Sequence, residues 1–549
     1  MGIRVWLVVF AVFIAAVGLE ARLGYLYLIE KDFLQDQGDA RTIRMERINA
    51  HRGMIRDKRG KPMAVSSPVI SLVANPKKII ADQGQLLRLS EHLGIPFDEF
   101  RKKIDRAQNR DFVYLRRHMP PPDAQKAISL GVQGVFGEKE YHRYYPAGEV
   151  SAHVVGITDI DDRGQEGLEL AFDQWLAGSS GKKKVLKNLH GEIIRDLMPV
   201  EEAIPGRNLD LSIDLRLQFL AYRELKSAIA HYSAASGSIV ILDVRTGQIL
   251  SMVNQPSYNP NNRFILDHAT LRNRAVTDQF EPGSTVKPFT VAAALQAGYL
   301  VDSEIDTNPG FVRVGDFTVR DPSNRGIINL SQIVALSSQV GISKLALTLN
   351  EHSVRELFQN IGFGQDTGFG FPGERTGTLP DHRRWTDIER ATFAYGYGLT
   401  VTPLQLATAY LTIGSGGIKR DATLLKNPRV SEKRVLDPVI ANEIKLMLKS
   451  VVDSGTGSKA AIAAYDVAGK TGTVRKIGRA GYEDTAHLAF FAGMTPVDNP
   501  LLVGVVLINE PSTKEYGGGA IAAPVFSRVM SSALRVLNIP PKQSLVVAR

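Results

Sequence analysis

An uncharged apolar run near the N-terminus constrains this chain more than any other feature. Residues 5–19, VWLVVFAVFIAAVGL, carry no charge, and the apolar character continues with few charges as far as Ile29. A helix needs about 20 mostly apolar residues to cross a bilayer. A removable signal peptide has a shorter apolar core and a small-x-small cleavage site. We therefore expect residues 5–29 to form one uncleaved membrane-spanning helix.

The charges around this run predict its orientation. Arg4 precedes the run, and positively charged flanks stay in the cytoplasm. We expect residues 1–4 to be cytoplasmic in a single-pass protein of the inner (cytoplasmic) membrane. The body that follows residue 29 is then on the periplasmic, outer side. A buried core helix is the alternative, and it requires partners that the sequence upstream does not offer.

The remainder of the chain has the composition of a globular protein. The 549 residues exceed one ordinary domain, and 44% hydrophobic with 22% charged residues excludes a disordered chain. The net charge of +9 is modest, and without a nucleic-acid motif we expect no nucleic-acid partner. The absence of cysteine excludes disulfides and thiol catalysis. The 11 histidines are scattered, so we expect no metal and no cofactor.

The chain divides near residues 200–215, where PGRNLDLSID leads into a long amphipathic helix ending about Tyr232. Short strands and turns predict a mostly β domain over residues 30–212, with helical periodicity over 79–132. The lysine run of residues 181–187, GKKKVLK, is typical of a solvated hairpin edge. Residues 213–549 place helices between two sets of strands. This order predicts an α+β architecture with an antiparallel sheet and packed helices.

The stretch EPGSTVKPF places Ser284 three residues before Lys287. An isolated serine in this setting is usually a plain helix N-cap. Here the serine follows Pro-Gly and opens an apolar helix, whose first N–H groups favour a developing oxyanion. Lys287 lies on the same helix face and accepts the serine proton only when it is neutral. Burial and a second nearby cation both favour the neutral lysine.

Two later stretches provide a second and a third motif. The stretch ALSSQVGISKLAL contains Ser337, and VAGKTGTVRK contains Lys470. Lys470 is the expected second cation, and the strand that carries it suits a sheet edge. Ser337 is expected to relay a proton toward a leaving amine. Serine enzymes that react with penicillins combine Ser-x-x-Lys, a Ser-Asp-Asn type triplet and Lys-Thr-Gly in this order.

With their surroundings, these motifs resemble the class B penicillin-binding proteins, which are monofunctional peptidoglycan transpeptidases, and most of all their cell-division branch. The stretches RGMIRDKRGKPMA, RYYPAGEVSAHVVG and GLELAFDQWLAG resemble the motifs of the family's N-terminal pedestal. Residues 393–410, FAYGYGLTVTPLQLATAY, are the most branch-specific. The resemblance covers nearly the whole chain. It implies an elongated, mostly β pedestal of the dimerisation type, followed by a penicillin-binding/serine β-lactamase-like transpeptidase domain.

The resemblance also implies a role for each motif residue. The catalytic residues are the nucleophile Ser284, the general base Lys287, Ser337, Gln339 and Lys470; the substrate-binding residues are Thr471, Gly472, Thr473 and, lining the cleft, Tyr482. Gln339 departs from the family, which has asparagine there. Glutamine keeps the amide but is one methylene longer. We expect retained activity with an altered substrate or β-lactam preference.

The implied function is a D,D-transpeptidase that cross-links stem peptides through a serine acyl-enzyme during septal wall synthesis. The implied partners are stem peptides of lipid-linked or nascent strands, β-lactams as covalent inhibitors, the septal glycosyltransferase FtsW and other division proteins. Two alternatives remain open. One is a D,D-carboxypeptidase or β-lactamase that uses water as the acceptor. The other is a non-catalytic division scaffold or β-lactam sensor, which only Gln339 favours.

Overall fold

The chain forms two compact units in a computed structural model. The structure describes residues 2–187, 193–262, 267–368, 370–427, 430–478 and 481–542. Unit 1 comprises Met1–Arg52, Ser66–His142 and Ala177–Arg207, and unit 2 comprises Gly53–Val65, Arg143–Leu176 and Asn208–Arg549. Both units mix helices with antiparallel strands, so the predicted α+β class is confirmed.

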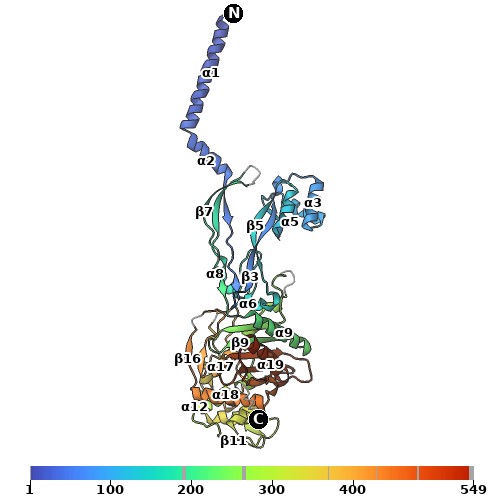
Figure 1. Cartoon of the computed structure of the whole chain (residues 1–549), viewed down its shortest axis with the longest axis vertical. Coiled ribbons are helices and arrows are strands. Elements are labelled where there is room, and N and C mark those ends of the chain that lie inside the picture. The colour runs from blue at the N-terminus through green and yellow to red at the C-terminus, as the bar shows by residue number, and fades with distance from the viewer. Residues whose placement is uncertain are drawn as a thin grey trace, which may run out of the picture. The chain divides into compact units, whose positions relative to one another are not determined.

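Unit 1 contains the N-terminal helices, a small helical lobe and a three-stranded sheet (Figure 1). Its elements are α1 (Gly2–Leu28), α2 (Lys31–Thr42), β1 (Ile43–Ile48), η1 (Pro76–Lys78), α3 (Gln83–Leu93), α4 (Phe97–Arg106), β4 (Val113–Met119), α5 (Pro121–Ser129), β6 (Gly181–Lys187) and β7 (Ile193–Glu201), with most of β3 (Pro62–Ala74) and β5 (Val135–Tyr144).

Helix α1 has the length and composition to cross a membrane. It spans 27 residues, and none of them is buried by the rest of the chain. Among the described residues it is the only helix that meets the criteria of length and hydropathy. Its full exposure argues against the core-helix alternative, because a core helix buries at least one face.

The helical lobe shows why periodicity predicted only part of the interval 79–132. Helix α3 ends at Gly94, whose φ of 63° provides the left-handed C-cap, and it begins with a capping box between Asp82 and Gln85. The lobe also contains strand β4, which the helical periodicity did not predict. β4 pairs with β3, and its buried residues Leu115 and Met119 pack in the same core as α3.

The lysine-rich strand β6 is not a sheet edge, and the prediction of an edge position is wrong. β6 lies in the centre of the sheet, between β1 and β7. Lys183 lies 3.4 Å from Glu46 of β1 and 3.0 Å from Asp196 of β7. Cross-strand pairs of opposite charge stabilise adjacent strands, so lysines on solvated faces are compatible with a central strand.

Unit 2 is the larger unit and contains the central sheet. Its elements are β2 (Ile55–Arg56), η2 (Gly148–Val150), α6 (Ala152–Val155), α7 (Gly167–Ala171), most of α8 (Asp173–Ala177), β8 (Leu209–Asp210), α9 (Leu215–His231), β9 (Ser236–Asp243), β10 (Ile249–Gln255), α10 (His268–Leu271), α11 (Arg274–Thr277), η4 (Gly283–Val286), α12 (Lys287–Gln296), β11 (Glu304–Asp306), β12 (Phe311–Val314), β13 (Phe317–Arg320), β14 (Ile327–Asn329), α13 (Leu330–Leu336), α14 (Gln339–Thr348), α15 (Ser353–Asn360), α16 (Asp387–Phe393), α17 (Pro403–Gly414), β15 (Ile418–Arg420), β16 (Glu432–Arg434), α18 (Pro438–Asp453), η5 (Ser458–Ala460), β17 (Ala468–Gly478), β18 (Gly481–Thr495), β19 (Leu502–Asn509) and α19 (Gly518–Val536).

The central sheet of unit 2 is antiparallel, with the strand order β10-β9-β19-β18-β17. Successive side chains of a strand point to opposite faces. Ile239 and Ile241 of β9 therefore pack with α9 and α19, whereas Val240 and Leu242 pack in the core that includes α17 (Figure 1). The predicted antiparallel sheet with packed helices is confirmed. β17, which carries Lys470, is an edge strand of this sheet.

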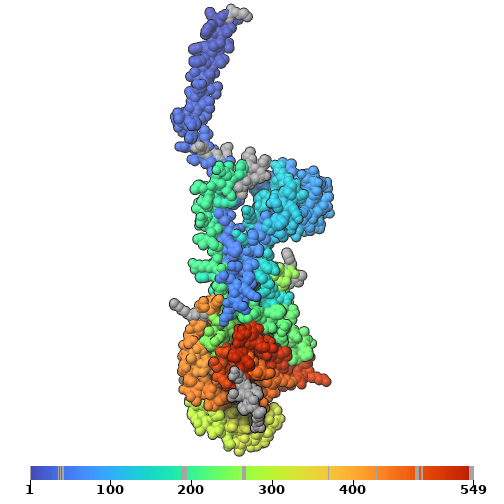
Figure 2. Space-filling view, in the orientation of Figure 1, coloured from blue at the N-terminus to red at the C-terminus, as the bar shows by residue number. Residues whose placement is uncertain are grey.

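Two small hairpins extend the helical side of unit 2. β11 pairs with β14, and β12 pairs with β13 between them. Figure 2 shows this segment, around residues 300–330 in yellow-green, gathered at one end of the unit. The segment after β13 contains Asp321, and β14 leads directly into α13. The hairpins thereby place Asp321 close to the turn between α13 and α14.

A buried ion pair joins two of the quoted pedestal-type stretches inside unit 2. Arg143 belongs to RYYPAGEVSAHVVG, and Glu169 belongs to GLELAFDQWLAG. Their side chains are fully buried, and Arg143 Nε donates to Glu169 Oε1 at 2.7 Å. Breaking a buried pair leaves an uncompensated charge in a low dielectric.

We predict that Arg143→Ala lowers the free energy of unfolding by about 3–5 kcal/mol, because Glu169 is then buried without its partner. Arg223→Ala is the matched control: it removes the exposed pair with Glu224 and is expected to cost at most about 1 kcal/mol. Urea unfolding of both variants measures the difference. An Arg143 variant as stable as the Arg223 variant contradicts this role.

Candidate active site

Ser284 lies in the short 3₁₀ helix η4, immediately before α12. The N-cap positions of η4 and α12 are Pro282 and Val286, and neither helix has a side-chain cap. The side chain of Ser284 therefore does not act as a plain N-cap. Gly283 has a φ of +49°, and a Cβ there would lie 2.6 Å from Val474 Cγ1. This close approach, which only glycine permits, holds η4 against the edge strand β17.

A chain of hydrogen bonds connects the first two motifs. Ser337 Oγ donates to Ser284 Oγ at 3.0 Å. Lys287 Nζ donates to Ser337 Oγ at 3.2 Å and to the Ser337 carbonyl oxygen at 2.6 Å. In the part of the chain that the structure describes, no hydrogen bond joins Lys287 directly to Ser284. Ser337 is thus the link between the two residues.

The position of Ser337 depends on Asp321, a residue that the motif search missed. Ser337 has a left-handed φ of 58° in the turn between α13 and α14. One carboxylate oxygen of Asp321 accepts from Ser338 Oγ at 2.5 Å, and the other accepts from the N–H of Gln339 at 2.6 Å. Asp321 thereby stabilises the turn that directs Ser337 toward Ser284. No motif in the sequence includes Asp321, because its contact with the turn is tertiary.

Lys287 and Lys470 are both fully buried, and both exposed fractions are 0%. Burial, followed by the charge of Lys470, holds the pKa of Lys287 well below its usual value, while Asp321 opposes this shift. Burial lowers the pKa of Lys470 to about 7. Lys470 Nζ has no hydrogen-bond partner among the described residues. Lys287 therefore loses its proton more readily than an exposed lysine does, and the neutral amine can accept a proton from a hydroxyl.

The third motif lies along β17. A Cβ on Gly472 would lie 2.0 Å from Phe490 Cε2, so close packing against β18 requires glycine here. Thr471 Oγ1 is 2.9 Å from Thr456 Oγ1, and Thr473 Oγ1 accepts from the N–H of Gly518 at 2.9 Å. The two hydroxyls are therefore oriented before any ligand arrives. Gly472, which the resemblance assigns to substrate binding, is thus also required for the packing of β17 against β18.

Tyr482 lies on β18 and is half exposed. Its hydroxyl donates to the Glu281 carboxylate, at 3.0 Å from Oε2 and 3.1 Å from Oε1. Glu281 Oε1 also accepts from the N–H of Gly398 at 2.9 Å. Burial raises the pKa of Glu281, although these hydrogen bonds oppose the shift. Glu281 thus ties Tyr482 to the branch-specific stretch 393–410, a role that the sequence analysis did not predict.

Gln339 stands apart from the hydrogen-bonded motif residues. It is the first residue of α14, and Asp321 holds its backbone N–H. Its half-buried side chain forms no hydrogen bond with any residue that the structure describes. The structure therefore brings Ser284, Ser337 and Lys287 into one network and leaves the amide of Gln339 outside it. Within the described ranges, no cluster of His, Cys, Asp and Glu has the arrangement of a metal site.

Two family models match the chain. The penicillin binding protein transpeptidase domain matches residues 237–531, and the penicillin-binding protein dimerisation domain matches residues 47–211. Together they cover all three motifs and most of the preceding part of the chain.

Several known proteins are similar over nearly their full length. The chain is 41% identical to the peptidoglycan D,D-transpeptidase FtsI of Escherichia coli K12, over 96% of this chain and 91% of that protein. It is 40% identical to the probable peptidoglycan D,D-transpeptidase PbpC of Pseudomonas aeruginosa, over 98% and 96%. The identity to the probable peptidoglycan D,D-transpeptidase PenA of Neisseria meningitidis serogroup B is 38%, over 99% and 94%.

Solved structures share the fold. Penicillin-binding protein 3 of Mycobacterium tuberculosis, complexed with aztreonam, has a TM-score of 0.71 and 25% identity, covering 91% of this chain and 99% of that chain. The apo transpeptidase domain of Burkholderia pseudomallei penicillin-binding protein 3 has a TM-score of 0.56 and 37% identity. This second match covers 61% of this chain and 98% of that chain.

We predict that Lys470→Gln moves the pH of half-maximal acylation by a fluorescent penicillin upward. The variant removes a positive charge that favours neutral Lys287, so the pKa of Lys287 rises and a higher pH is needed to deprotonate it. Lys102→Gln, at an exposed position of unit 1, is the control. An unchanged pH profile of the Lys470 variant contradicts the electrostatic coupling of the two lysines.

We also predict that Asp321→Ala slows acylation roughly 100-fold, because a misplaced Ser337 no longer links Lys287 to Ser284. Asp321→Asn keeps one acceptor oxygen and is expected to restore part of the rate. Asp316→Ala, which changes an exposed carboxylate in the same hairpin, is the control. Stopped-flow kinetics separate the acylation step from penicillin binding. A defect confined to binding contradicts the positioning role.

Proposed function

The chain belongs to the class B penicillin-binding proteins, in the branch of FtsI and penicillin-binding protein 3, and from this premise we propose how it acts as a peptidoglycan D,D-transpeptidase. The substrate is a stem peptide that ends in D-alanyl-D-alanine. The observation that carries the proposal is the hydrogen-bond chain Lys287–Ser337–Ser284 beside two buried lysines. This arrangement supports a serine made nucleophilic by a neutral amine.

In the proposed acylation step, Ser284 Oγ forms a bond to the carbonyl carbon of the penultimate D-alanine. Lys287 takes the hydroxyl proton. Because Lys287 and Ser284 are not directly hydrogen-bonded to each other, the proton passes through Ser337. The N–H groups of Ser284 and Thr473 stabilise the oxyanion. The C–N bond then breaks, and the leaving D-alanine amine takes a proton by way of Ser337. Lys470, Thr471 and Thr473 hold the peptide along the edge strand.

In the proposed second step, an amino group of a neighbouring stem attacks the acyl-enzyme carbonyl. Lys287 takes a proton from the attacking nitrogen by way of Ser337 and a new amide bond forms. The bond to Ser284 Oγ then breaks, and Lys287 returns the proton to the serine oxygen. A β-lactam enters the same first step, but its leaving nitrogen stays tethered to the acyl group. The acyl-enzyme then persists, as expected for a covalent inhibitor.

Membrane placement and partners complete the proposal. Helix α1 supports anchoring in the inner membrane, with residues 1–4 in the cytoplasm and the rest of the body in the periplasm. By analogy with the branch, the proposed partners are FtsW and other septal division proteins. A water-accepting carboxypeptidase and a non-catalytic scaffold remain the alternatives. The scaffold reading rests on Gln339, whose side chain makes no hydrogen bond to the residues around Ser284.

We predict that a fluorescent penicillin labels the wild-type protein covalently and that Ser284→Ala abolishes the labelled band, because the nucleophile is lost. Ser323→Ala, an exposed serine without a hydrogen-bond partner in the described structure, is the matched control and keeps the band. A band that decays within seconds indicates a β-lactamase instead. Complete absence of a wild-type band contradicts the enzymatic proposal.

A further inference from the structure

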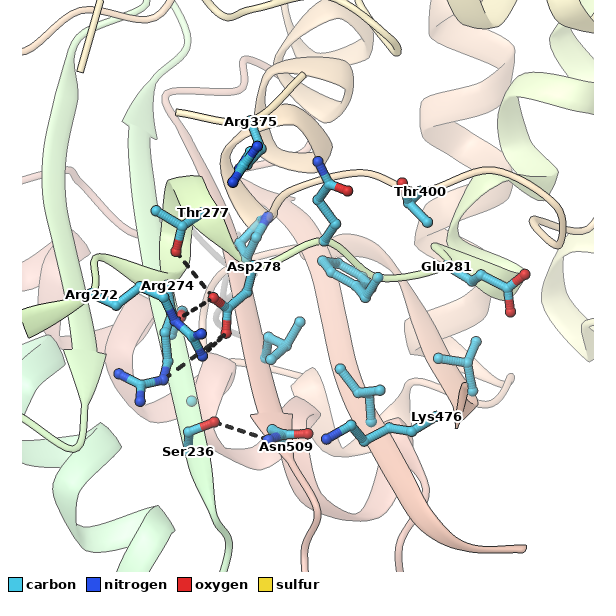
Figure 3. Close-up of a pocket in the computed structure, with 18 of the residues that line it drawn as sticks. Ser236, Arg272, Arg274, Thr277, Asp278, Glu281, Arg375, Thr400, Lys476 and Asn509 are labelled. Carbon is cyan, nitrogen blue, oxygen red and sulfur yellow. Dashed lines mark hydrogen bonds and ion pairs between the residues drawn. The ribbon is translucent and has the colours of Figure 1, made fainter. Parts of the chain in front are cut away.

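A cavity of about 530 Å³ lies in unit 2 beside the central sheet, separate from the hydroxyl of Ser284. Residues of β9, α11, β17, β18 and β19 line it, together with the segment that precedes η4 (Figure 3). We call it the basic cavity and define it by Arg274, Asp278, Arg375, Lys476, Asn509 and Ser236. None of Ser284, Lys287 and Ser337 lines it.

Cations outnumber carboxylates on the walls of the basic cavity. The cationic lining residues are Arg272, Arg274, Arg375, Arg475 and Lys476; the acidic ones are Asp278 and Glu281. Glu281 is already engaged by Tyr482 and the N–H of Gly398. The single carboxylate of Asp278 lies between two guanidiniums, 2.9 Å from Arg272 Nε and 4.0 Å from Arg274 Nε (Figure 3). Lys476 is paired with Glu510, which is not a lining residue. The excess of positive charge therefore rests on Arg272 and Arg274, which share one carboxylate, and on Arg375.

Arg274 is a buried member of this set of cations. Its side chain is 9% exposed, and Nη2 donates to the Ala269 carbonyl oxygen at 3.1 Å. Nε and Nη1 have no hydrogen-bond partner among the described residues. Burial and the charge of Arg272 lower the pKa of Arg274, while Asp278 raises it. A buried guanidinium with unused donors costs free energy until an oxyanion satisfies them.

Asn509 adds an unsatisfied acceptor to the lining of the basic cavity. Its Nδ2 donates to Ser236 Oγ at 3.0 Å, and its Oδ1 is buried without a partner among the described residues (Figure 3). An oxygen of this kind accepts a hydrogen bond from an N–H group. A ligand that satisfies both Arg274 and Asn509 therefore combines an oxyanion with an N–H donor. An acidic peptide has both groups, whereas a pyrophosphate has only the oxyanion.

The basic cavity adjoins the strand on which the substrate is proposed to lie. Val474 and Lys476 of β17 line the cavity, and Val474 also contacts Gly283 of the first motif. β17 continues from Lys470–Thr473 directly into these residues. We propose that the basic cavity binds the carboxylate-bearing part of an acidic stem peptide while Ser284 reacts. The identity of the peptide as a stem rests on the proposed function; the anion site itself rests only on the residues named here.

The test is calorimetric titration of the full-length protein in detergent with a synthetic L-Ala-γ-D-Glu-diaminopimelate tripeptide, before and after penicillin has acylated Ser284. We expect binding to survive acylation, because the cavity is separate from the serine. Arg274→Gln and the exposed Arg375→Gln are expected to weaken binding at least about tenfold, as for loss of a charge-assisted hydrogen bond. Arg383→Gln, an exposed arginine that does not line the cavity, is the matched control and is expected to bind like the wild type.

Three results overturn the proposal. One is equal binding of the tripeptide by the two cavity variants and the Arg383 variant. Another is equal affinity for a fully amidated, uncharged tripeptide. The third is binding of inorganic pyrophosphate, but not of the tripeptide, with the same dependence on Arg375. Because penicillin labelling of Ser284 is measured in the same samples, failure of the proposed function shows as absent labelling and is distinguished from failure of peptide binding.

Discussion

The reactivity of this protein depends on the burial of two lysines in one packed site. Lys287 and Lys470 are both fully excluded from solvent, so each charge is expensive and each pKa falls. The packed hydrophobic cores on both faces of the central sheet offset the free energy that burying these two lysines costs. A lysine that would be a cation on the surface thereby becomes available as a base, and Ser337 connects it to Ser284.

The rest of unit 2 serves to hold three distant segments at this point. Gly283 permits η4 to contact Val474, and Gly472 permits β17 to pack on Phe490. Asp321 holds the turn that contains Ser337. The first two contacts hold the edge strand β17 against η4 and against its neighbour β18, and the third holds the turn between α13 and α14. Rigid elements therefore set the geometry, as a preorganised site requires.

The sequence predicted those features that are local in the chain. Periodicity or turn residues predict the membrane-type helix, the helical periodicity that contains α3, the long helix α9 and the strand that carries Lys470. The contacts of Asp321 and Glu281 were missed because they join segments far apart, for which one sequence contains no signal. The central position of β6 was missed because lysines reveal exposed faces but not the number of neighbouring strands.

The most direct test of this account is the pKa of Lys287 itself. Heteronuclear NMR of the full-length protein in detergent, with ¹³Cε-labelled lysine, follows the titration of each amine, and the signal absent in Lys287→Gln identifies the residue. The account predicts a titration well below 10.5, the ordinary lysine value, and a shift to higher pH in Lys470→Gln. A Lys287 signal that titrates at the ordinary value would contradict the claim that burial prepares the base.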